Sequence, residues 1–164
     1  MIILGIDPGT AITGYGIVEV KGNKFYYLGH GCIFTDAKLP MEKRIQKIYE
    51  KVSELVEIYR PNDLAVEELF FNKNVQTAIT VGQARGVVLL VGAMKGLNVK
   101  GYTPLQVKQA VVGYGRAQKC QVQQMVKTFL NLNEIPKPDD AADALAIAIC
   151  HAHFKQTTLR SGQI

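Results

Sequence analysis

The sequence predicts an α/β fold, with a mixed sheet of five strands and helices on its faces. Short apolar, β-branched segments come first, and longer segments follow in which apolar residues recur every three or four positions. The chain has 164 residues, 48% of them hydrophobic, which is enough for one domain with a full core. We therefore expect one domain over residues 1–155 and a flexible tail over 156–164.

The first three strands are expected to form an antiparallel meander. Apolar, β-branched and aromatic residues dominate three segments near the N-terminus. These segments are 2–7, 12–20 and 25–35. Gly22-Asn23 is a hairpin turn signal between the second and the third. The first segment is apolar up to Asp7, as expected of a strand buried on both faces, and Pro8 ends it because proline cannot donate to a sheet ladder.

The next segments predict a crossover followed by a helical second half. Apolar residues repeat at helical spacing over 40–59, and 63–67 is expected to be a strand parallel to the first, because strand–helix–strand crossovers are right-handed. Residues 74–95 are apolar nearly all round, which indicates a helix that is either buried or part of an oligomer interface. A short strand is expected at 99–102. Further helices are expected from Thr103-Pro104, at 119–131 and at 139–153.

Charge is distributed unevenly along the chain. No aspartate or glutamate occurs from Leu69 through Asn133, whereas the same stretch carries eight basic residues. They are Lys73, Arg85, Lys95, Lys100, Lys108, Arg116, Lys119 and Lys127. A positive stretch of this kind suggests a surface that binds a polyanion, although an ordinary solvated face with a skewed charge would give the same pattern.

Cysteine usage and hydropathy predict a cytoplasmic protein that does not enter a membrane. Cys32, Cys120 and Cys150 are far apart and odd in number, and they show no metal-binding spacing. No uninterrupted apolar run approaches the ~20 residues of a membrane span. The N-terminus also lacks the basic leader of a signal peptide.

Four carboxylates are candidates for one shared site. Asp7 ends the first strand and Glu67 ends the fourth, so neighbouring parallel strands would place both at the same sheet edge. Asp140 and Asp143 are three residues apart at the start of the last helix and share one helical face. Each acid taken alone could equally be a helix cap or a surface charge.

Taken together, the four acids predict a metal site. Converging carboxylates repel one another strongly unless a cation neutralises them. Ligand sets made only of oxygen select hard cations, so Mg²⁺ or Mn²⁺ is expected. Two such ions would stabilise the attacking and leaving oxygens of an in-line phosphoryl displacement.

Five motifs, in order from residue 2 to about residue 153, resemble the RuvC family of crossover (Holliday) junction endodeoxyribonucleases. They are Ile-Leu-Gly-Ile-Asp-Pro-Gly-Thr, Ala-Val-Glu-Glu-Leu-Phe-Phe-Asn-Lys-Asn, Gly-Gln-Ala-Arg-Gly, Gln-Val-Lys-Gln-Ala-Val-Val-Gly and Asp-Ala-Ala-Asp-Ala-Leu-Ala-Ile-Ala. The resemblance implies a ribonuclease H-like fold, a homodimer and Mg²⁺-dependent cleavage. It further implies paired symmetric nicks that resolve four-way DNA junctions in recombination and repair, and it suggests branch-migration helicase subunits as partners.

The resemblance also implies roles for particular residues. The family's catalytic, metal-binding acids match Asp7, Glu67, Asp140 and Asp143. Its junction-contacting aromatic matches Phe70, and its functional lysines match Lys108 and Lys119. The lysines could simply contact phosphates, or one could stabilise charge that develops on the scissile phosphate.

Neighbouring residues extend this assignment. Lys73, in the loop after the fourth strand, and Arg116, at the end of a glycine-rich loop, are further DNA-binding candidates. We expect Phe70 to point outward, where its ring can stack on an unpaired base, and Phe71 to point inward. Glu68 matches a position that is not catalytic in the family. We interpret Asp139 as a helix-start charge.

Two other functions fit part of the sequence. An actin-like or sugar-kinase-like ATPase also begins with an apolar strand, an aspartate and a Gly-Thr turn, but such proteins need two domains and a longer chain. A non-catalytic junction-binding module would have no reason to keep four acids. In the mechanism that we expect, one metal ion activates water and the other supports the leaving 3′ oxygen. The resemblance to the RuvC family implies that the products carry 5′-phosphate ends.

Overall fold

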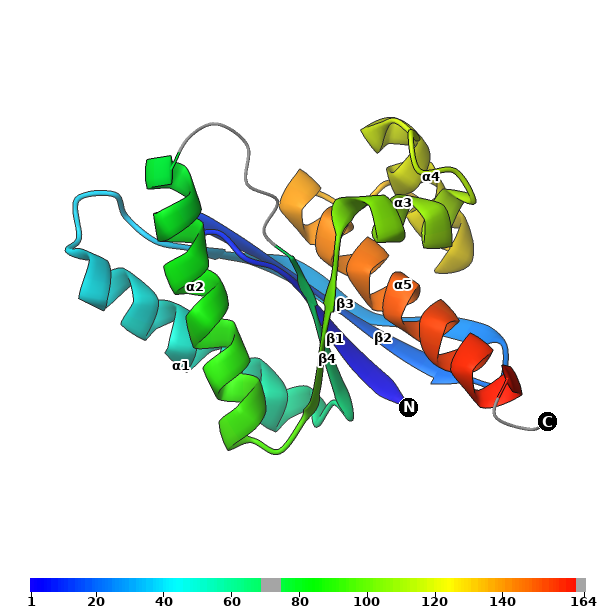
Figure 1. The fold of residues 1–164 in the computed structure, drawn as a ribbon, viewed down its shortest axis with the longest axis horizontal. Coiled ribbons are helices and arrows are strands. Elements are labelled where there is room, and N and C mark those ends of the chain that lie inside the picture. The colour runs from blue at the N-terminus through cyan, green and yellow to red at the C-terminus, as the bar shows by residue number, and fades with distance from the viewer. Residues whose placement is uncertain (69–74, 162–164) are drawn as a thin grey trace.

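The computed structural model describes residues 1–68 and 75–161 and shows a central sheet with helices on both faces (Figure 1). The strands lie in the order β3-β2-β1-β4-β5. Their bounds are Ile2–Asp7 (β1), Ile12–Lys21 (β2), Lys24–Phe34 (β3), Asp63–Glu67 (β4) and Asn98–Tyr102 (β5). β1, β2 and β3 pair antiparallel, whereas β4 is parallel to both β1 and β5. The predicted mixed sheet, with its meander and its adjacent first and fourth strands, is confirmed.

The turn between β2 and β3 lies where the sequence predicts it. Gly22 has a φ of 58°, a left-handed conformation that costs glycine little. Lys21 pairs with Lys24 across this turn, so each strand extends one residue closer to the turn than predicted.

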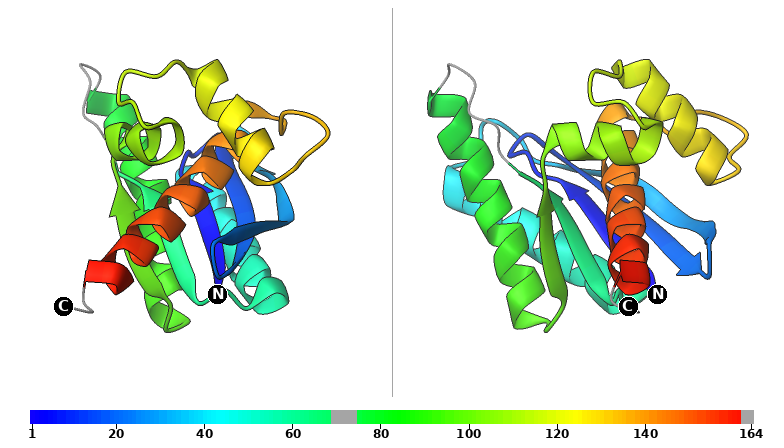
Figure 2. Two further views of the ribbon diagram at one scale, coloured as in Figure 1. Left: turned by 90° about the vertical axis from the view of Figure 1, so that its right-hand side faces the viewer. Right: turned by 45° about the vertical axis from the view of Figure 1, so that its right-hand side comes forward.

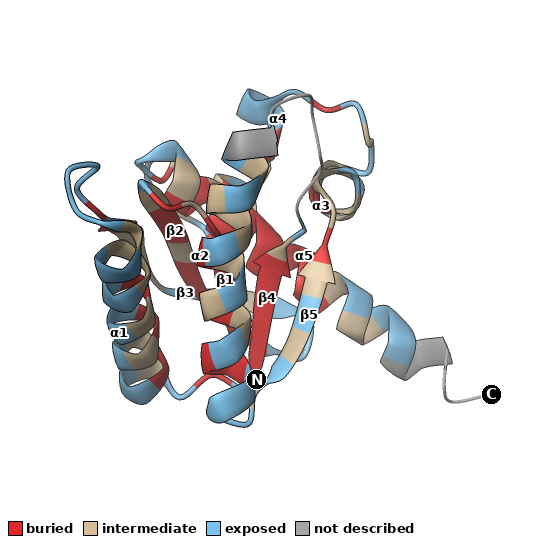
Figure 3. Cartoon of the chain, turned by 60° about the vertical axis from the view of Figure 1, so that its left-hand side comes forward, coloured by how far each residue is buried: buried red, intermediate tan, exposed pale blue. Residues whose placement is uncertain are grey.

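Two sets of helices cover the sheet (Figures 1 and 2). α1 (Met41–Tyr59) and α2 (Val75–Met94) pack together on one face. α5 (Asp139–Ser161) crosses the other face, and α3 (Pro104–Val112) and α4 (Lys119–Phe129) pack against α5. The central strands are therefore covered on both sides, and β4 in particular is buried along most of its length (Figure 3).

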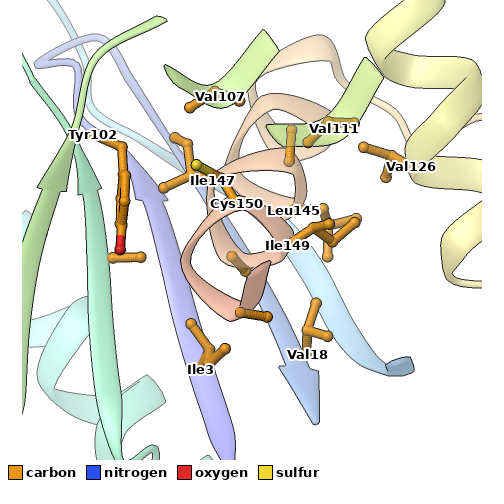
Figure 4. Close-up of a cluster of buried hydrophobic side chains, with 14 of the residues drawn as sticks. Ile3, Val18, Tyr102, Val107, Val111, Val126, Leu145, Ile147, Ile149 and Cys150 are labelled. Atoms are coloured by element: carbon orange, nitrogen blue, oxygen red, sulfur yellow. The ribbon is translucent and has the colours of Figure 1, made fainter. Parts of the chain in front are cut away.

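Strand alternation divides the core between the two sets of helices. Leu4 and Ile17 belong to the apolar cluster that includes α1 and α2. Their sequence neighbours Ile3 and Val18 point the other way, into the cluster that α3, α4 and α5 complete (Figure 4). Buried apolar side chains make up both clusters, and the second cluster holds α5 firmly against the sheet.

The start of α3 follows from its sequence. The Thr103 hydroxyl oxygen accepts a hydrogen bond from the Gln106 main-chain N–H at 3.3 Å, and the Gln106 side chain accepts one from the Thr103 N–H at 2.9 Å. This reciprocal pair is a capping box, and Pro104 occupies the first turn, where no N–H is needed. The predicted helix start at Thr103-Pro104 is confirmed.

α5 is longer than the sequence predicts. It continues to Ser161, so the tail predicted over 156–164 is helical as far as that residue. The Lys155 ammonium donates to the Asp63 carboxylate at 2.6 Å, and Gln156 donates to a carbonyl of the β2–β3 turn at 2.9 Å. These tertiary bonds stabilise the end of the helix, and local sequence does not reveal them.

α2 is the most apolar helix of the described chain. By length and composition alone, residues Thr77–Met94 could cross a membrane. In this structure, 22% of that window is buried within the protein. The core helix of a soluble protein passes the same test. Ala84, Val88 and Val91 of this helix are fully buried in the core beneath the sheet.

Candidate active site

Two acidic side chains reach the same sheet edge because their strands are adjacent and in register. Ile6 of β1 lies beside Val66 of β4, so the following residues, Asp7 and Glu67, end the two strands together. Every second residue of a strand faces the same side of the sheet. Gly5, two residues before Asp7, faces α5 and lies against Ala144. Asp7 and Glu67 therefore point toward α5, and their side chains are hydrogen-bonded to each other.

The first turn of α5 brings Asp140 against this strand pair because β2 carries a glycine there. Gly14 pairs with Asp7 across the sheet. A side chain at Gly14 would overlap the main-chain carbonyl of Asp140, so only glycine admits the helix this closely. The predicted meeting of a distant helix with the strand ends thus depends on a close approach of two backbones.

The four carboxylates repel one another in a partly buried site. Burial, followed by the charges of Glu67 and Asp143, raises the pKa of Asp7 from 3.8 to about 8, and Asp140 adds to the rise. Burial also raises the pKa of Glu67 and of Asp143. Asp7 therefore resists losing its proton at neutral pH, because the buried acids cannot all be charged without a compensating cation.

The donor set fits a divalent cation. Every candidate ligand is a carboxylate, which is the ligand type that Mg²⁺ and Mn²⁺ prefer. Among the described residues, no three His, Cys, Asp or Glu side chains already have the arrangement of a metal site. Instead, the Lys119 ammonium lies 2.8 Å from the Asp143 carboxylate. A metal ion would replace this ammonium at Asp143 and the proton at Asp7.

Two of the predicted DNA-binding residues lie at the site. Lys108 of α3 and Lys119 of α4 line a cavity of about 220 Å³ together with Glu67 and Asp143. Apolar side chains of α3, α4 and α5 form its other walls. A phosphate approaching the carboxylates would therefore meet both lysines.

The other predicted DNA-binding residues are not placed at the cavity. Arg116 is exposed in the loop between α3 and α4, and it does not line the cavity beside the acids. Phe70 and Lys73 lie outside the described residues, as does Phe71. The expected directions of the two rings therefore stay predictions.

Arg85 is a residue near the site whose contact the sequence did not reveal. Its Nε donates to the main-chain carbonyl of Glu67 at 3.1 Å, which links α2 to the end of β4. The bond fixes the backbone from which the Glu67 carboxylate projects. The available signal was the Gly-Gln-Ala-Arg-Gly motif, but a motif does not indicate which atom the arginine contacts.

Comparison with known proteins decides the family. A family model described as "Crossover junction endodeoxyribonuclease RuvC" matches residues 3–151. The chain belongs to the RuvC family. Curated relatives of that name include a Desulforamulus reducens protein, 58% identical over 157 residues and 96% of each chain. Another, from Pelotomaculum thermopropionicum, is 61% identical over 153 residues and 93% of each chain.

Solved RuvC structures share the whole fold. Thermus thermophilus RuvC superimposes with a TM-score of 0.90 at 40% identity, over 96% of this chain and 97% of that one. The same protein in complex with a Holliday junction substrate gives a TM-score of 0.93 at 41% identity, over 96% of each chain. The yeast mitochondrial resolvase Ydc2 shares the fold at a TM-score of 0.65 and 16% identity, over 98% of this chain and 85% of that one.

Membership in the RuvC family settles the choice between the functions that the sequence allowed. The chain is a metal-dependent crossover junction endodeoxyribonuclease with a ribonuclease H-like fold. The predicted family, fold and nuclease activity in Holliday junction resolution are confirmed. The ATPase and the non-catalytic binding module are set aside.

Proposed function

We propose that this RuvC-family nuclease cuts four-way (Holliday) DNA junctions with four catalytic residues that bind Mg²⁺. These residues are Asp7, Glu67, Asp140 and Asp143. The observation that most supports the proposal is the raised pKa of Asp7, about 8, which reports burial and repulsion among acids from β1, β4 and α5. A structure keeps such repulsion when a bound cation relieves it.

Two Mg²⁺ ions per site, or Mn²⁺ in their place, would activate the attacking water and stabilise the leaving 3′ oxygen. The residues of this chain hold and orient the reacting groups. Asp7 and Glu67 offer oxygens from the sheet, and Asp140 and Asp143 offer oxygens from α5. Lys108 or Lys119 donates to the scissile phosphate as charge develops there, and the products carry 5′-phosphate ends.

Metal binding should strengthen as the pH rises toward 8. Asp7 must lose its proton before it can act as a ligand, and its pKa is about 8. Below that pH, the Mn²⁺ dissociation constant should therefore increase by up to about tenfold per pH unit. Calorimetry in buffers of different ionisation enthalpy measures both the affinity and the number of protons released.

A control separates this effect from a general dependence on pH. The variant Asp7→Asn has no proton to release at this position, so its weaker Mn²⁺ binding should vary less between pH 6 and 8. Metal binding to the unchanged protein that is independent of pH, with no proton released, would contradict the proposed role of Asp7.

The proposed DNA surface extends outward from the cavity. Lys108 and Lys119 lie nearest the acids, and exposed Arg116 follows on the loop between α3 and α4. Phe70 and Lys73, from the segment after β4, would contact DNA at the junction centre. These residues would read the shape of the junction through phosphates and deformability, with base preference as a secondary filter.

We also propose a homodimer that forms through α2. Ile79, Leu90 and Met94 are exposed by 59%, 52% and 63%, and their spacing places them on one face of the helix. Gly86 on the same helix has open space where a side chain would be, which would let a partner helix approach closely. A two-fold dimer matches the symmetry of a four-way junction and would produce paired nicks.

Leu90→Glu should dissociate this dimer. A charge buried in an apolar interface is costly, so the monomer fraction should rise at least about tenfold at micromolar protein. Sedimentation velocity measures the assembly, and a cleavage map on a mobile synthetic junction measures whether symmetric nicks remain paired.

Ile58→Glu is the matched control for this experiment. Ile58 is 63% exposed on α1 and lines a groove with side chains of β2 and β3 but none of α2, so this variant should remain dimeric and keep paired nicks. A Leu90→Glu protein that stays dimeric would show that α2 is not the interface.

Three wider assignments stay predictions. They are the cytoplasmic location, the single nuclease domain over residues 1–155 and the association with branch-migration helicase subunits. A pull-down with purified helicase subunits on junction DNA would test the last of them.

A further inference from the structure

Lys119, the first residue of α4, binds two carboxylates of α5 at once. Its ammonium lies 2.8 Å from the Asp143 oxygen Oδ2 and 3.4 Å from the Asp139 oxygen Oδ2. The other oxygen of Asp139 accepts a hydrogen bond from Gln123 Nε2, one turn further along α4, at 3.0 Å. Asp139 thus has both oxygens engaged by the same helix, and it does more than place a charge at the start of α5.

The contact with Asp143 cannot persist when the proposed metal ion is bound. A divalent cation on the Asp143 carboxylate would repel the ammonium that lies 2.8 Å from the same group. Lysine is a long, flexible side chain that can turn its ammonium without moving the backbone. The second carboxylate, Asp139, is already close enough to retain the ammonium after such a turn.

We infer that Asp139 is a positioning residue that retains Lys119 beside the site while Asp143 changes its partner from this ammonium to a metal ion. The inference rests on the proposed function of Asp143 as a ligand. Gln123 orients the Asp139 carboxylate for this task. The Lys119 ammonium then remains at the cavity that the scissile phosphate enters, instead of turning away into solvent.

A purely stabilising role for Asp139 does not fit its surroundings. The Asp139 and Lys119 side chains are 64% and 51% exposed, and ion pairs exposed to this degree contribute little to stability. Replacing Asp139 should therefore leave the melting temperature almost unchanged. An effect on cleavage would then come from the placement of Lys119.

A double-mutant cycle tests whether Asp139 acts through Lys119. Asp139→Asn should slow single-turnover junction cleavage at saturating metal by about tenfold, and Asp139→Glu should restore most of the rate. In the Lys119→Met background, the same Asp139→Asn change should have no further effect. A further tenfold loss in that background, or unchanged cleavage in Asp139→Asn alone, would overturn the inference.

Metal binding without DNA gives a second readout. Lys119→Met removes the ammonium that competes at Asp143, so Mn²⁺ should bind about tenfold more tightly in the absence of DNA. Unchanged or weaker Mn²⁺ binding would show that Lys119 does not compete with the metal ion.

Asp143→Asn distinguishes failure of this inference from failure of the proposed function. If Asp143→Asn still binds Mn²⁺ normally and cuts the junction, Asp143 is not a ligand and the proposed function itself is wrong. If Asp143→Asn is inactive while Asp139→Asn behaves like the unchanged protein, only the positioning role of Asp139 is lost.

Discussion

Asp7→Asn should abolish junction cleavage and leave junction binding intact. Asparagine keeps the shape of the side chain but cannot offer an anionic oxygen, so the metal-dependent steps lose their support. We expect the single-turnover rate to fall by about 10³-fold or more, which corresponds to several kcal/mol of lost transition-state stabilisation. Cleavage of a synthetic four-way junction in Mg²⁺ measures the rate, and gel-shift titration in Ca²⁺ or EDTA measures binding.

The same substitution should not destabilise the metal-free protein. Burial and three neighbouring acids raise the pKa of Asp7 to about 8, so its carboxylate form is unfavourable in the fold. Between pH 3.8 and 8, the folded state binds more protons than the unfolded state, and the stability of the metal-free protein falls as the pH rises. Asp7→Asn removes this unfavourable ionisation of Asp7 in the folded state. The melting temperature of the variant near pH 8 should therefore equal or exceed that of the unchanged protein.

Glu68→Gln is the control for position and charge. Glu68 directly follows the proposed ligand Glu67 but lies against Gly101 of β5. The Glu68→Gln variant should therefore cleave the junction at the rate of the unchanged protein. An Asp7→Asn protein that still cuts the junction in Mg²⁺ would show that Asp7 is not a ligand.

Asp63→Ala should destabilise the fold by about 3 kcal/mol, because it removes charge-assisted hydrogen bonds to a buried carboxylate. Asp63 is fully buried at the start of β4. Its carboxylate accepts hydrogen bonds from Asn98 at 3.0 Å and from Lys155 at 2.6 Å, and His151 Nε2 lies 3.1 Å away. Tyr102 completes the cluster, with its hydroxyl 2.9 Å from His151 Nδ1. Urea unfolding measures the loss.

The pKa of Asp63 gives this prediction a pH dependence. Burial acts to raise the pKa, but the hydrogen bonds from Lys155 and Asn98 and the contact with His151 outweigh it and lower the pKa below 3.8. Because the folded-state pKa is depressed, the stabilisation is present above the unfolded-state value near 4 and is lost as the pH falls through the folded-state value. The difference between Asp63→Ala and the unchanged protein should therefore shrink below about pH 4.

An exposed ion pair provides the comparison. Lys95 and Glu57 are 2.8 Å apart, but the glutamate side chain is 68% exposed. Glu57→Ala should change the free energy of unfolding far less than Asp63→Ala does, because solvent screens an exposed ion pair. Equal losses of stability in Glu57→Ala and Asp63→Ala would mean that burial of Asp63 does not make its contacts more stabilising than an exposed ion pair.

The sheet and the four acids could be predicted because local patterns encode them. Apolar runs ending at Asp7 and Glu67, and the right-handed crossover between them, place both acids at one edge before any coordinates are known. The spacing of Asp140 and Asp143 gives their shared helical face in the same way. The family resemblance then distinguished Glu67 from Glu68, and strand alternation in the structure agrees.

The remaining features depend on contacts between distant segments. The glycine of β2 that admits Asp140 has no local signature, because its importance comes from a helix more than a hundred residues away. The sequence predicts too early an end for α5, because the Lys155–Asp63 bond that stabilises the end joins residues 92 positions apart. The sequence gives no sign that Lys119 and Asp139 bind each other, and the structure shows their ion pair at 3.4 Å.

The contact between buried Asp63 and half-buried Lys155 helps to fix where α5 lies along its own axis. Asp143 and Lys155 are separated by about 18 Å of helix at 1.5 Å per residue. Because Lys155 is tied to the start of β4 and Asp143 faces the end of the same strand, α5 cannot slide without breaking the tie. The distance between the carboxylates of the sheet and those of α5 therefore depends partly on a contact at the opposite end of β4. Residues far from the proposed site would thereby set the spacing of the proposed ligands.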